Sequence, residues 1–449
     1  MIVLISTPVM ESLRFPATGI YALKAILNLN SFVNRCFDLS KETFNKFGEE
    51  QCKNIDAYLM DYSKDENFDT LVKTFYRKFL IKKVKPLNPE WIGISIFSNY
   101  NFKSSVILSK IIREEFPHTK IILGGSGIID SIPVGIKYDF WIKGDAEESL
   151  IELLKTNKQP EFKRLKTNLD FLPFPDYSDY KKDFGNPKEI MITGSRGCIY
   201  NCTPCDTKSY WKTFSFRSPE NIIQEILYNK DLYNIKAFLF SDSLINGNMT
   251  IFRNLLKLLC KVKIPFGGHL SVRKEFTVED FQLMAEANFK APVIGIESMS
   301  NKVRSDMSKF FSNKTIYFMM DNLIAQKISP YLLFLVSYPT ETEKDFQKTI
   351  NFLKHYSDAA KRLNITVGFG PTLFIFPNTP LGDLDIWYQK NKMSKLFWKS
   401  TVVPNLDFPE RVRRRKILST IAKELGYVLI RDEEQQTYLK KKLIAYKEL

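Results

Sequence analysis

The sequence predicts an α/β protein in which two successive series of strands and helices are joined by a short linker. Two observations favour this class. Short apolar runs alternate with segments of helical periodicity over residues 1–165, and the same alternation resumes over residues 189–382. Between them, residues 166–188 include LDFLPFPDYSDY, whose prolines and aromatic residues without a clear period indicate a packed linker. Residues 383–449 are expected to form a basic, mostly helical C-terminal region.

Residues 1–165 are expected to form a Rossmann-like domain around a parallel sheet. The predicted strands are MIVLIST, WIGISIFS and KIILGGSG, and YDFWIKGDAEESLIELLK looks like a further strand, a glycine turn and a helix. Strands that alternate with helices imply a parallel sheet, and open sheets of this kind bind ligands beyond the carboxyl ends of their strands. Gly124 and Gly125 lie just past such an end.

Residues 189–382 are expected to form a partial (β/α)6 barrel of the TIM type. Its six predicted strands are EIMITGSRGC, KAFLFSD, PFGGHLSV, APVIGIES, SPYLLFLVSYP and ITVGFGPTLFIF. Helix starts are predicted at Ser218, followed by proline, and at Thr340, which forms a capping box with Glu343. Barrels of this type place their chemistry at the carboxyl ends of the strands.

The composition favours a cytoplasmic protein. The chain has 449 residues, of which 44% are hydrophobic, and two or three domains are expected for this length. No stretch approaches the roughly 20 apolar residues that a membrane helix needs. The opening MIVLISTPVMESLRFP is followed by no small-residue cleavage site, which argues against a signal peptide. We therefore expect a soluble protein without a membrane span.

The formal net charge of +15 is concentrated towards the C-terminus. Residues 391–449 hold fourteen Lys and Arg against seven Asp and Glu, a balance of 14 − 7 = +7, and their centre is RVRRRK at 411–416. Such a run could bind nucleic acid or an acidic partner. A solvated helix accounts for it equally simply, and we favour that interpretation because a charge run alone has little specificity.

Three of the six cysteines lie in GCIYNCTPC, with the spacing C-x3-C-x2-C, on a glycine-containing loop directly after the first predicted barrel strand. A disulfide is disfavoured because cytosolic thiols stay reduced. A structural zinc site needs four ligands, and the next candidates, Cys260 and His269, are far along the chain. An iron–sulfur cluster usually takes four cysteines, so three would leave one iron open for another ligand. On the residues alone, both zinc and the cluster stay open.

This spacing in this context resembles the radical S-adenosylmethionine (radical SAM) superfamily. The order of the two predicted domains is similar to the subgroup with an N-terminal cobalamin-binding domain, as are the segments FWIKGDAEESLIELL, LPFPDYSDY, GIESMSNKVRSDM and LVSYPTETEKDF. The resemblance implies a [4Fe–4S] cluster whose open iron binds S-adenosylmethionine. It also implies reductive cleavage to a 5′-deoxyadenosyl radical, electrons from a flavodoxin or ferredoxin type of carrier, and, with cobalamin, methylation of an unactivated carbon.

The resemblance also implies roles for individual residues. Cys198, Cys202 and Cys205 match the cluster ligands, and the matched or substituted cofactor contacts in the barrel are Tyr200, Asp242, Arg273 and Glu297. In the N-terminal domain the expected cobalamin contacts are Ser95, Gly124, Gly125 and Gly144, although such glycines also serve simply to turn the chain. His269 is interpreted as structural, since a lone histidine on a strand usually is.

Three departures from the family pattern leave alternatives open. An aspartate–histidine–glycine motif that would supply a lower cobalt ligand is absent, and Pro204 stands where an aromatic residue usually precedes the third cysteine, so that Tyr200 or Trp211 would have to substitute. A Gly-Gly-Glu segment after the second barrel strand is also missing. One alternative is a radical SAM enzyme with an empty cobalamin-type domain that catalyses cyclisation, rearrangement or oxidation. Another, of a different class, is a non-catalytic iron–sulfur protein that binds nucleic acid.

Overall fold

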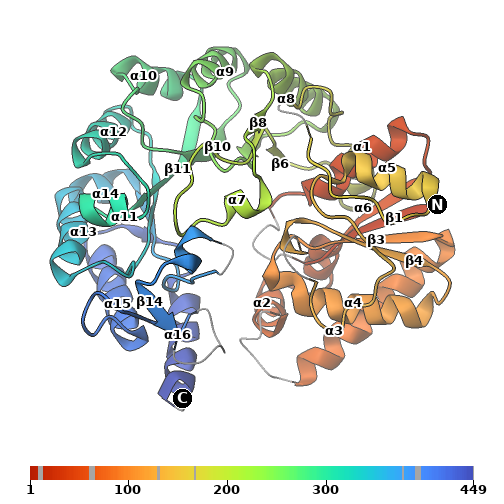
Figure 1. Ribbon diagram of the computed structural model, residues 1–449. Coiled ribbons are helices and arrows are strands. Elements are labelled where there is room, and N and C mark those ends of the chain that lie inside the picture. The colour runs from red at the N-terminus through yellow and green to blue at the C-terminus, as the bar shows by residue number, and fades with distance from the viewer. Residues whose placement is uncertain are drawn as a thin grey trace. The chain divides into compact units, whose positions relative to one another are not determined.

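The computed structural model has the α/β fold class that the sequence predicts (Figure 1). It describes residues 1–8, 14–59, 66–128, 132–165, 168–376, 379–389 and 396–447. The chain divides into two compact units. The N-terminal unit comprises Met1–Met191, Ser215–Arg217 and Gln224–Ala237, and the C-terminal unit comprises Ile192–Phe214, Ser218–Ile223 and Phe238–Leu449.

The N-terminal unit contains a parallel sheet of five strands in the order β2-β1-β3-β4-β5. The strands are β1 (Ile2–Ser6), β2 (Asn34–Asp38), β3 (Trp91–Ser95), β4 (Lys120–Gly124) and β5 (Phe140–Trp141). The central strand β1 is buried along its whole length, as its unbroken apolar run predicts for a sheet that is covered on both faces.

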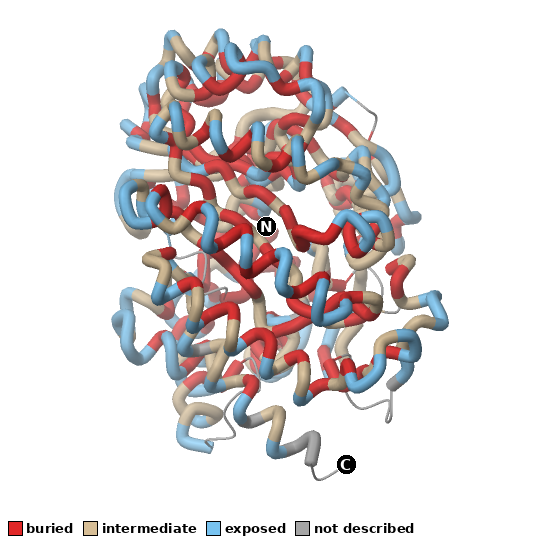
Figure 2. Tube along the Cα trace, turned by 90° about the vertical axis from the view of Figure 1, so that its left-hand side faces the viewer, coloured by how far each residue is buried: buried red, intermediate tan, exposed pale blue. Residues whose placement is uncertain are grey.

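Helices surround this sheet. They are α1 (Thr18–Leu29), α2 (Leu39–Leu59, broken at Gly48), α3 (Glu66–Phe79), α4 (Phe102–Glu115), α5 (Ala146–Thr156) and α6 (Ser178–Phe184). The buried faces of α2, α3 and α4 join the strands in one apolar core, which contains Ile5, Val72, Ile94, Leu108 and Leu123. Along the outer helices of both units, buried and exposed residues alternate, as amphipathic packing requires (Figure 2).

Strand β2 was not predicted, because its sequence NRCFD reads as polar. In the structure, the polar groups that hide this strand from a hydrophobic pattern have partners. Arg35 forms ion pairs with Asp179 and Asp183, and the Cys36 amide donates to the Asp179 carboxylate at 2.8 Å. Since these partners lie on α6, far along the chain, a local hydrophobic pattern could not reveal the strand.

The segment that follows the first domain packs against the N-terminal unit. The ring of Tyr21 on α1 lies 5.3 Å from that of Tyr177 and 6.2 Å from that of Tyr180, measured between centroids. Tyr177 is fully buried, so this part of residues 168–188 belongs to the hydrophobic interior of that unit.

The second sheet has seven strands in the order β16-β13-β12-β11-β10-β9-β6, and its pairings from β9 to β16 are parallel. The strands are β6 (Glu189–Ile192), β9 (Ala237–Phe240), β10 (Phe266–Leu270), β11 (Phe289–Glu297), β12 (Tyr331–Phe334), β13 (Thr366–Gly368) and β16 (Val428–Leu429). The six predicted strands are present. The seventh, β16, has only two residues, too few to show a period.

Helices of the second half cover the outside of this sheet in an arc (Figure 1). They are α8 (Pro219–Tyr233), α9 (Met249–Val262), α10 (Val278–Glu286), α11 (Asn301–Asp306), α12 (Asn313–Ala325), α13 (Glu343–His355) and α14 (Ser357–Leu363). Stacked rings of Phe238, Phe266 and Phe289 join β9, β10 and β11, with centroids 5.3 and 4.5 Å apart. This ladder accounts for part of the high phenylalanine content.

One predicted helix start is confirmed and the other is wrong. Helix α8 begins at Pro219, and the Asn221 amide donates to the Ser218 hydroxyl. Helix α13, however, is capped by Thr342, which forms the capping box with Asp345. The hydroxyl of Thr340 donates instead to the carboxylate of Asp306 and is thereby unavailable as a cap.

The C-terminal region is mostly helical, as expected, with α15 (Phe408–Glu424) and α16 (Asp432–Lys447) after a hairpin of β14 (Trp387–Gln389) and β15 (Trp398–Ser400). The interpretation of RVRRRK as a solvated face is wrong for three of its arginines. Arg411, Arg414 and Arg415 are at most 4% exposed. They reach backbone carbonyls and acidic side chains inside the unit. Among the described residues, no helix is long and apolar enough to cross a membrane.

Candidate functional site

The three cysteines of GCIYNCTPC lie on a loop that glycine allows to turn sharply. This loop runs from β7 (Ser195–Arg196), which pairs with β8 (Ser215–Phe216), to α7 (Thr207–Tyr210). Gly197 has a φ of +85°, and a Cβ atom there would lie 2.4 Å from the carbonyl oxygen of Thr213. Any other residue would therefore have to displace the backbone just before Cys198.

The tip of the loop is fastened to the rest of the unit through Thr203. Its amide donates to the Met307 carbonyl at 3.1 Å, and its own carbonyl accepts from the Leu381 amide at 2.8 Å. Its hydroxyl also lies 2.8 Å from the hydroxyl of Tyr338. Because Thr203 stands between Cys202 and Cys205, these bonds fix the positions from which both thiols project.

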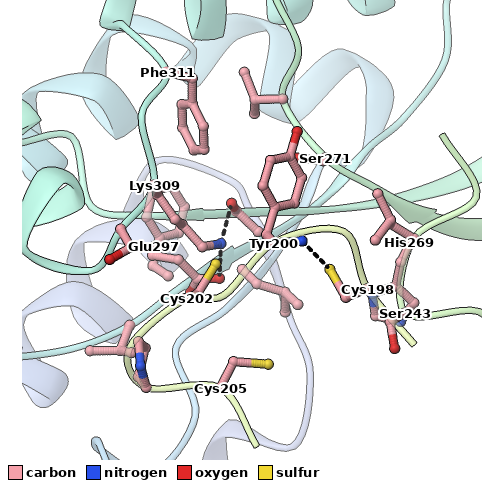
Figure 3. A pocket seen from close by; sticks show the side chains of 18 of the residues that line it. Cys198, Tyr200, Cys202, Cys205, Ser243, His269, Ser271, Glu297, Lys309 and Phe311 are labelled. Carbon is pink, nitrogen blue, oxygen red and sulfur yellow. Dashed lines mark hydrogen bonds and ion pairs between the residues drawn. The ribbon is translucent and has the colours of Figure 1, made fainter. Parts of the chain in front are cut away.

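The loop forms one end of a cavity of about 1030 Å³ at the carboxyl ends of the strands (Figure 3). Among the residues predicted from the sequence, Cys198, Tyr200, Cys202, Cys205, Arg273 and Glu297 all line it. The structure thus brings together residues that are up to 99 positions apart in the chain. Asp242 and Trp211 are not among the residues that line this cavity.

The three thiols line the cavity and do not converge on the position of a single metal ion. Cys198 and Cys202 are half-buried and Cys205 is exposed. Within the described part of the chain, no three Cys, His, Asp or Glu side chains are close enough to hold one metal ion. A four-iron cluster is larger than an ion and meets its thiolates at separate corners, so this donor set fits the cluster better than a zinc ion. Burial raises the pKa of Cys202 to about 11, so a bound cation must supply the charge that makes it a thiolate.

Glu297 reaches the cavity because of a bulge at the end of β11. The register with β12 shifts between Gly295 and Glu297, and Glu297 adopts a left-handed φ of +65°. Such irregularities redirect side chains next to functional sites. The carboxylate of Glu297 then accepts from the Lys309 ammonium at 2.9 Å. A Cβ atom at Gly295 would lie 2.6 Å from that carboxylate, so glycine makes room for the pair.

Sequence reasoning missed Lys309, which follows α11 and also donates to the Gly295 carbonyl at 3.2 Å (Figure 3). Burial lowers the pKa of Lys309, but Glu297 and the nearby thiols outweigh burial, and the net shift is upwards. Its ammonium is therefore charged beside the cysteine loop. In the sequence, the pair appears only as a carboxylate at the end of a strand and a lysine twelve residues later. No short motif marks such a pair.

Arg273 lines the cavity, but its guanidinium is largely engaged. One nitrogen donates to the carbonyls of Asn246 and Gly247, at 3.0 and 2.8 Å, and another to Glu275 at 2.8 Å. Tyr200, on the cysteine loop, is half-buried and has its backbone amide 3.4 Å from the Cys198 sulfur. Of these two, Tyr200 presents its ring more freely to a ligand.

Asp242 has a different position from the one that the resemblance implies. It is 3% exposed, and its carboxylate accepts from the Gly194 amide at 2.8 Å and from the Ser195 hydroxyl at 2.6 Å. Burial raises its pKa to about 7, although these hydrogen bonds lower it. In this structure Asp242 holds the chain just ahead of the cysteine loop.

We expect Asp242→Asn to change how stability depends on pH. A carboxyl group whose pKa is raised by folding stabilises the fold fully below its unfolded value of 3.8, and this contribution is lost as the pH rises towards about 7. The unfolding free energy of the wild type should therefore fall relative to that of the variant by up to about 1.4 kcal/mol per pH unit between about pH 5 and 7. Urea denaturation over this range tests it, with the exposed Asp383→Asn as control. Parallel pH profiles for wild type and Asp242→Asn would contradict the assignment.

His269 lies on β10 with its side chain in the cavity, contrary to its interpretation as a structural residue (Figure 3). Burial lowers its pKa, and Glu297 opposes this. The other two histidines are elsewhere: His118 is exposed before β4, and His355 packs edge-on against Tyr317 and Tyr356. A neutral imidazole in the cavity can accept or donate one hydrogen bond to a ligand.

In the N-terminal unit, the four expected contacts differ in the space around them. Gly124 and the half-buried Ser95 end adjacent strands, and a Cβ atom at Gly124 would meet nothing within 4 Å. Gly125 and Gly144 have left-handed φ angles, and Cβ atoms there would lie 2.3 Å from the Ile96 carbonyl and 2.4 Å from the Lys163 carbonyl. These two glycines therefore serve local packing, whereas Gly124 leaves the edge of the sheet open.

Three thiols at the carboxyl edge of a parallel partial barrel define an iron–sulfur enzyme that leaves one coordination position to a cofactor. Residues 192–353 match the family model of the Radical SAM superfamily. This part of the chain therefore carries a radical SAM domain, and this domain implies a [4Fe–4S] cluster and S-adenosylmethionine.

Relatives with methyltransferase names are similar to this chain. It is 22% identical over 381 residues to an uncharacterised methyltransferase of Pyrococcus horikoshii, covering 76% of this chain and 80% of the relative. It is 27% identical over 171 residues to the cytidylyl-2-hydroxyethylphosphonate methyltransferase of Streptomyces wedmorensis, covering 34% and 32% of the two chains. The second match thus spans about a third of that relative.

Two solved structures share the fold. The radical S-adenosylmethionine methyltransferase TsrM from Kitasatospora setae, solved with tryptophan substrate and a SAM analogue, matches with a TM-score of 0.66 and 14% identity over 99% of each chain. The cobalamin-dependent S-adenosylmethionine radical enzyme OxsB, with aqua-cobalamin and S-adenosylmethionine bound, matches with a TM-score of 0.64 and 15% identity, over 100% of this chain and 71% of OxsB. At these identities the likeness concerns the fold.

Proposed function

We propose that this enzyme is a cobalamin-dependent radical SAM methyltransferase that acts on an unactivated carbon. The observation that carries the proposal is the single cavity in which three thiols face a carboxylate–ammonium pair, Glu297 and Lys309. S-adenosylmethionine carries both an ammonium and a carboxylate group, so a paired acid and base beside an open iron site is complementary to it.

Each residue then has a distinct task. Cys198, Cys202 and Cys205 would hold the cluster, and Glu297 would accept hydrogen bonds from the ammonium of S-adenosylmethionine. Lys309 would donate to its carboxylate, and Tyr200 would pack against its adenine. The cluster and S-adenosylmethionine, when bound, would supply a 5′-deoxyadenosyl radical with an electron from an external carrier of the flavodoxin or ferredoxin type. The wall residues would orient the substrate and exclude water.

Cobalamin is supported by the N-terminal unit. Its parallel sheet ends in the open position at Gly124, beside Ser95 on the adjacent strand. TsrM and OxsB, which share the fold, have been solved with cobalamin. His118, the one histidine of that unit, precedes β4 at the end of the strand opposite Gly124 and so does not lie where it would ligate cobalt there. We therefore propose cobalamin without a histidine ligand from this unit.

The decisive experiment uses anaerobically purified, iron-reconstituted protein that has been supplied with hydroxocobalamin and desalted. Its visible spectrum is recorded, and 5′-deoxyadenosine is then assayed after dithionite and S-adenosylmethionine are added. Retained corrin bands together with 5′-deoxyadenosine support the proposal. Release of 5′-deoxyadenosine without corrin bands would instead favour an enzyme with an empty N-terminal domain. If protein that retains its iron shows neither corrin bands nor 5′-deoxyadenosine, the catalytic assignment is overturned.

Lys309→Met should weaken the binding of S-adenosylmethionine without removing the cluster. A lost charge-assisted hydrogen bond is worth about 1.5–3 kcal/mol, which corresponds to roughly 10- to 150-fold in affinity. Equilibrium dialysis of the reconstituted protein measures this directly. The matched control is Lys302→Met on α11. The side chain of Lys302 is 61% exposed and forms an ion pair with Asp306. Equal affinities of the Lys309 and Lys302 variants would contradict the role given to Lys309.

A role in RNA methylthiolation is not favoured by the described residues. Relatives with methylthiotransferase names match over about a third of this chain. A second cluster would need further thiols, yet Cys36 is fully buried on β2 and Cys52 is buried on α2. Three of the four arginines of α15, Arg411, Arg414 and Arg415, are likewise buried rather than presented to a nucleic acid.

A further inference from the structure

We propose that the substrate is an uncharged, largely apolar molecule, held by the side of the cavity that β12, β13 and the segment after β13 form. This inference rests on the proposed function and names the substrate class for the same cavity. We call this side the apolar wall. Its residues are Leu333, Phe334, Leu335, Val336, Gly368, Phe369, Gly370, Thr372, Leu373, Phe374 and Phe376.

Charge is strictly divided between the two sides of the cavity. Among the described lining residues, every charged side chain lies at the end of β11 or in the segments that follow β10 and β11: they are Arg273, Lys274, Glu275, Glu297 and Lys309. The apolar wall has no charged residue and one hydroxyl, that of Thr372. The cysteines and charged groups are thus gathered where the cluster and S-adenosylmethionine would bind, and the other side is left to the substrate.

Three polar atoms of the apolar wall already have hydrogen-bond partners behind it. The Gly370 carbonyl accepts from Arg415 at 2.5 Å, and the Leu373 carbonyl accepts from Arg411 at 3.2 Å and from the Trp398 indole at 2.9 Å. The Thr372 hydroxyl also lies 3.3 Å from the Arg411 guanidinium, which donates to it. These carbonyls and this hydroxyl therefore point away from a ligand, and what the wall offers is apolar surface.

The arginines that back the wall are themselves enclosed. Arg411 is 0% and Arg415 is 1% exposed, so neither can turn its charge towards a substrate. Arg411 stacks 3.9 Å from the centroid of the Trp398 ring, and Arg415 pairs with Asp432 at 2.7 Å. An ionised substrate group placed against the apolar wall would lose its water without gaining a partner, at a cost of several kcal/mol.

Two half-buried aromatic rings make this wall suitable for a flat or ring-containing body. Phe374 and Phe376 are half-buried, with ring centroids 6.3 Å apart and planes inclined by 24°. The cavity of about 1030 Å³ is at the upper end of the range for ligand sites, so it has room for a substrate beside S-adenosylmethionine.

The test compares two probes that share one aromatic system and differ in charge. N-phenyl-1-naphthylamine is neutral, and 8-anilinonaphthalene-1-sulfonate carries a sulfonate. Both are titrated by fluorescence into reconstituted holoenzyme saturated with S-adenosylmethionine, which occupies the charged side. We expect the neutral probe to bind at least about tenfold more tightly, because an uncompensated charge costs more than 1.4 kcal/mol.

Variants assign this preference to the apolar wall. Phe374→Lys, and separately Phe376→Lys, should weaken the binding of the neutral probe and strengthen the binding of the anionic probe. Phe318→Lys, on the outer helix α12, is the matched control and should change neither. Equal binding of both probes, or insensitivity to both wall variants, would overturn the inference. Corrin bands and 5′-deoxyadenosine are measured on the same preparations, so a failure of the proposed function itself is seen separately.

Discussion

Cys202→Ala should yield a folded protein that no longer retains a four-iron cluster and no longer releases 5′-deoxyadenosine. Cys202 stands next to Thr203, the anchored tip of the loop, and lines the cavity close to Lys309. Since changes to outer-shell partners of a metal already cost about 10- to 100-fold, loss of a ligand should reduce product formation by more than about 100-fold. Iron content, the visible absorption of the cluster and 5′-deoxyadenosine are the measurements.

The matched control for this prediction is Cys260→Ala. Cys260 lies on α9, lines no part of the cavity, and has its sulfur 3.9 Å from the Leu283 carbonyl. This variant should keep its iron and its activity. If Cys202→Ala retained the cluster, or if Cys260→Ala lost it to the same extent, the assignment of the ligands would be wrong.

Arg411→Leu should destabilise the C-terminal unit by at least about 3 kcal/mol. The guanidinium is fully buried and donates to the carbonyls of Leu373, Leu396 and Trp398. Each of these acceptors, if it is left buried without a partner, costs about 1–3 kcal/mol. The measurement is the midpoint and slope of urea unfolding, followed by fluorescence.

Arg413→Leu is the comparison for this prediction, because it lies in the same run of arginines. Its side chain is 51% exposed and pairs with Glu410 at 2.7 Å on the surface. Exposed ion pairs contribute about 0–1 kcal/mol, so this variant should stay close to the wild type. A similar loss of unfolding free energy in both variants would mean that burial does not distinguish the two arginines.

These two predictions also show what the sequence could and could not reveal. The cysteine spacing after a strand, and Glu297 at the end of a later strand, were recognisable because both lie at ends of predictable strands. Lys309 was not, since its partner is fixed by a bulge and a left-handed backbone at Glu297. A non-local contact of this kind leaves no periodic trace in the sequence.

The charge run of α15 failed as a predictor for a related reason. A sequence gives the number of arginines but not the depth at which they lie, and here the acceptors for Arg411 and Arg415 come from segments 13 to 45 residues away. Strand β2 was hidden in the same way, because Arg35 meets its acidic partners on α6. In each case a long-range ion pair or hydrogen bond satisfies an arginine that the local sequence pattern would place in solvent.

The bond between the Thr203 carbonyl and the Leu381 amide has a consequence for how the enzyme matures. During synthesis the three thiols leave the ribosome long before residue 381 does, so the loop that bears them is first made without this anchor. The loop can therefore reach its anchored conformation only after nearly the whole barrel has been synthesised.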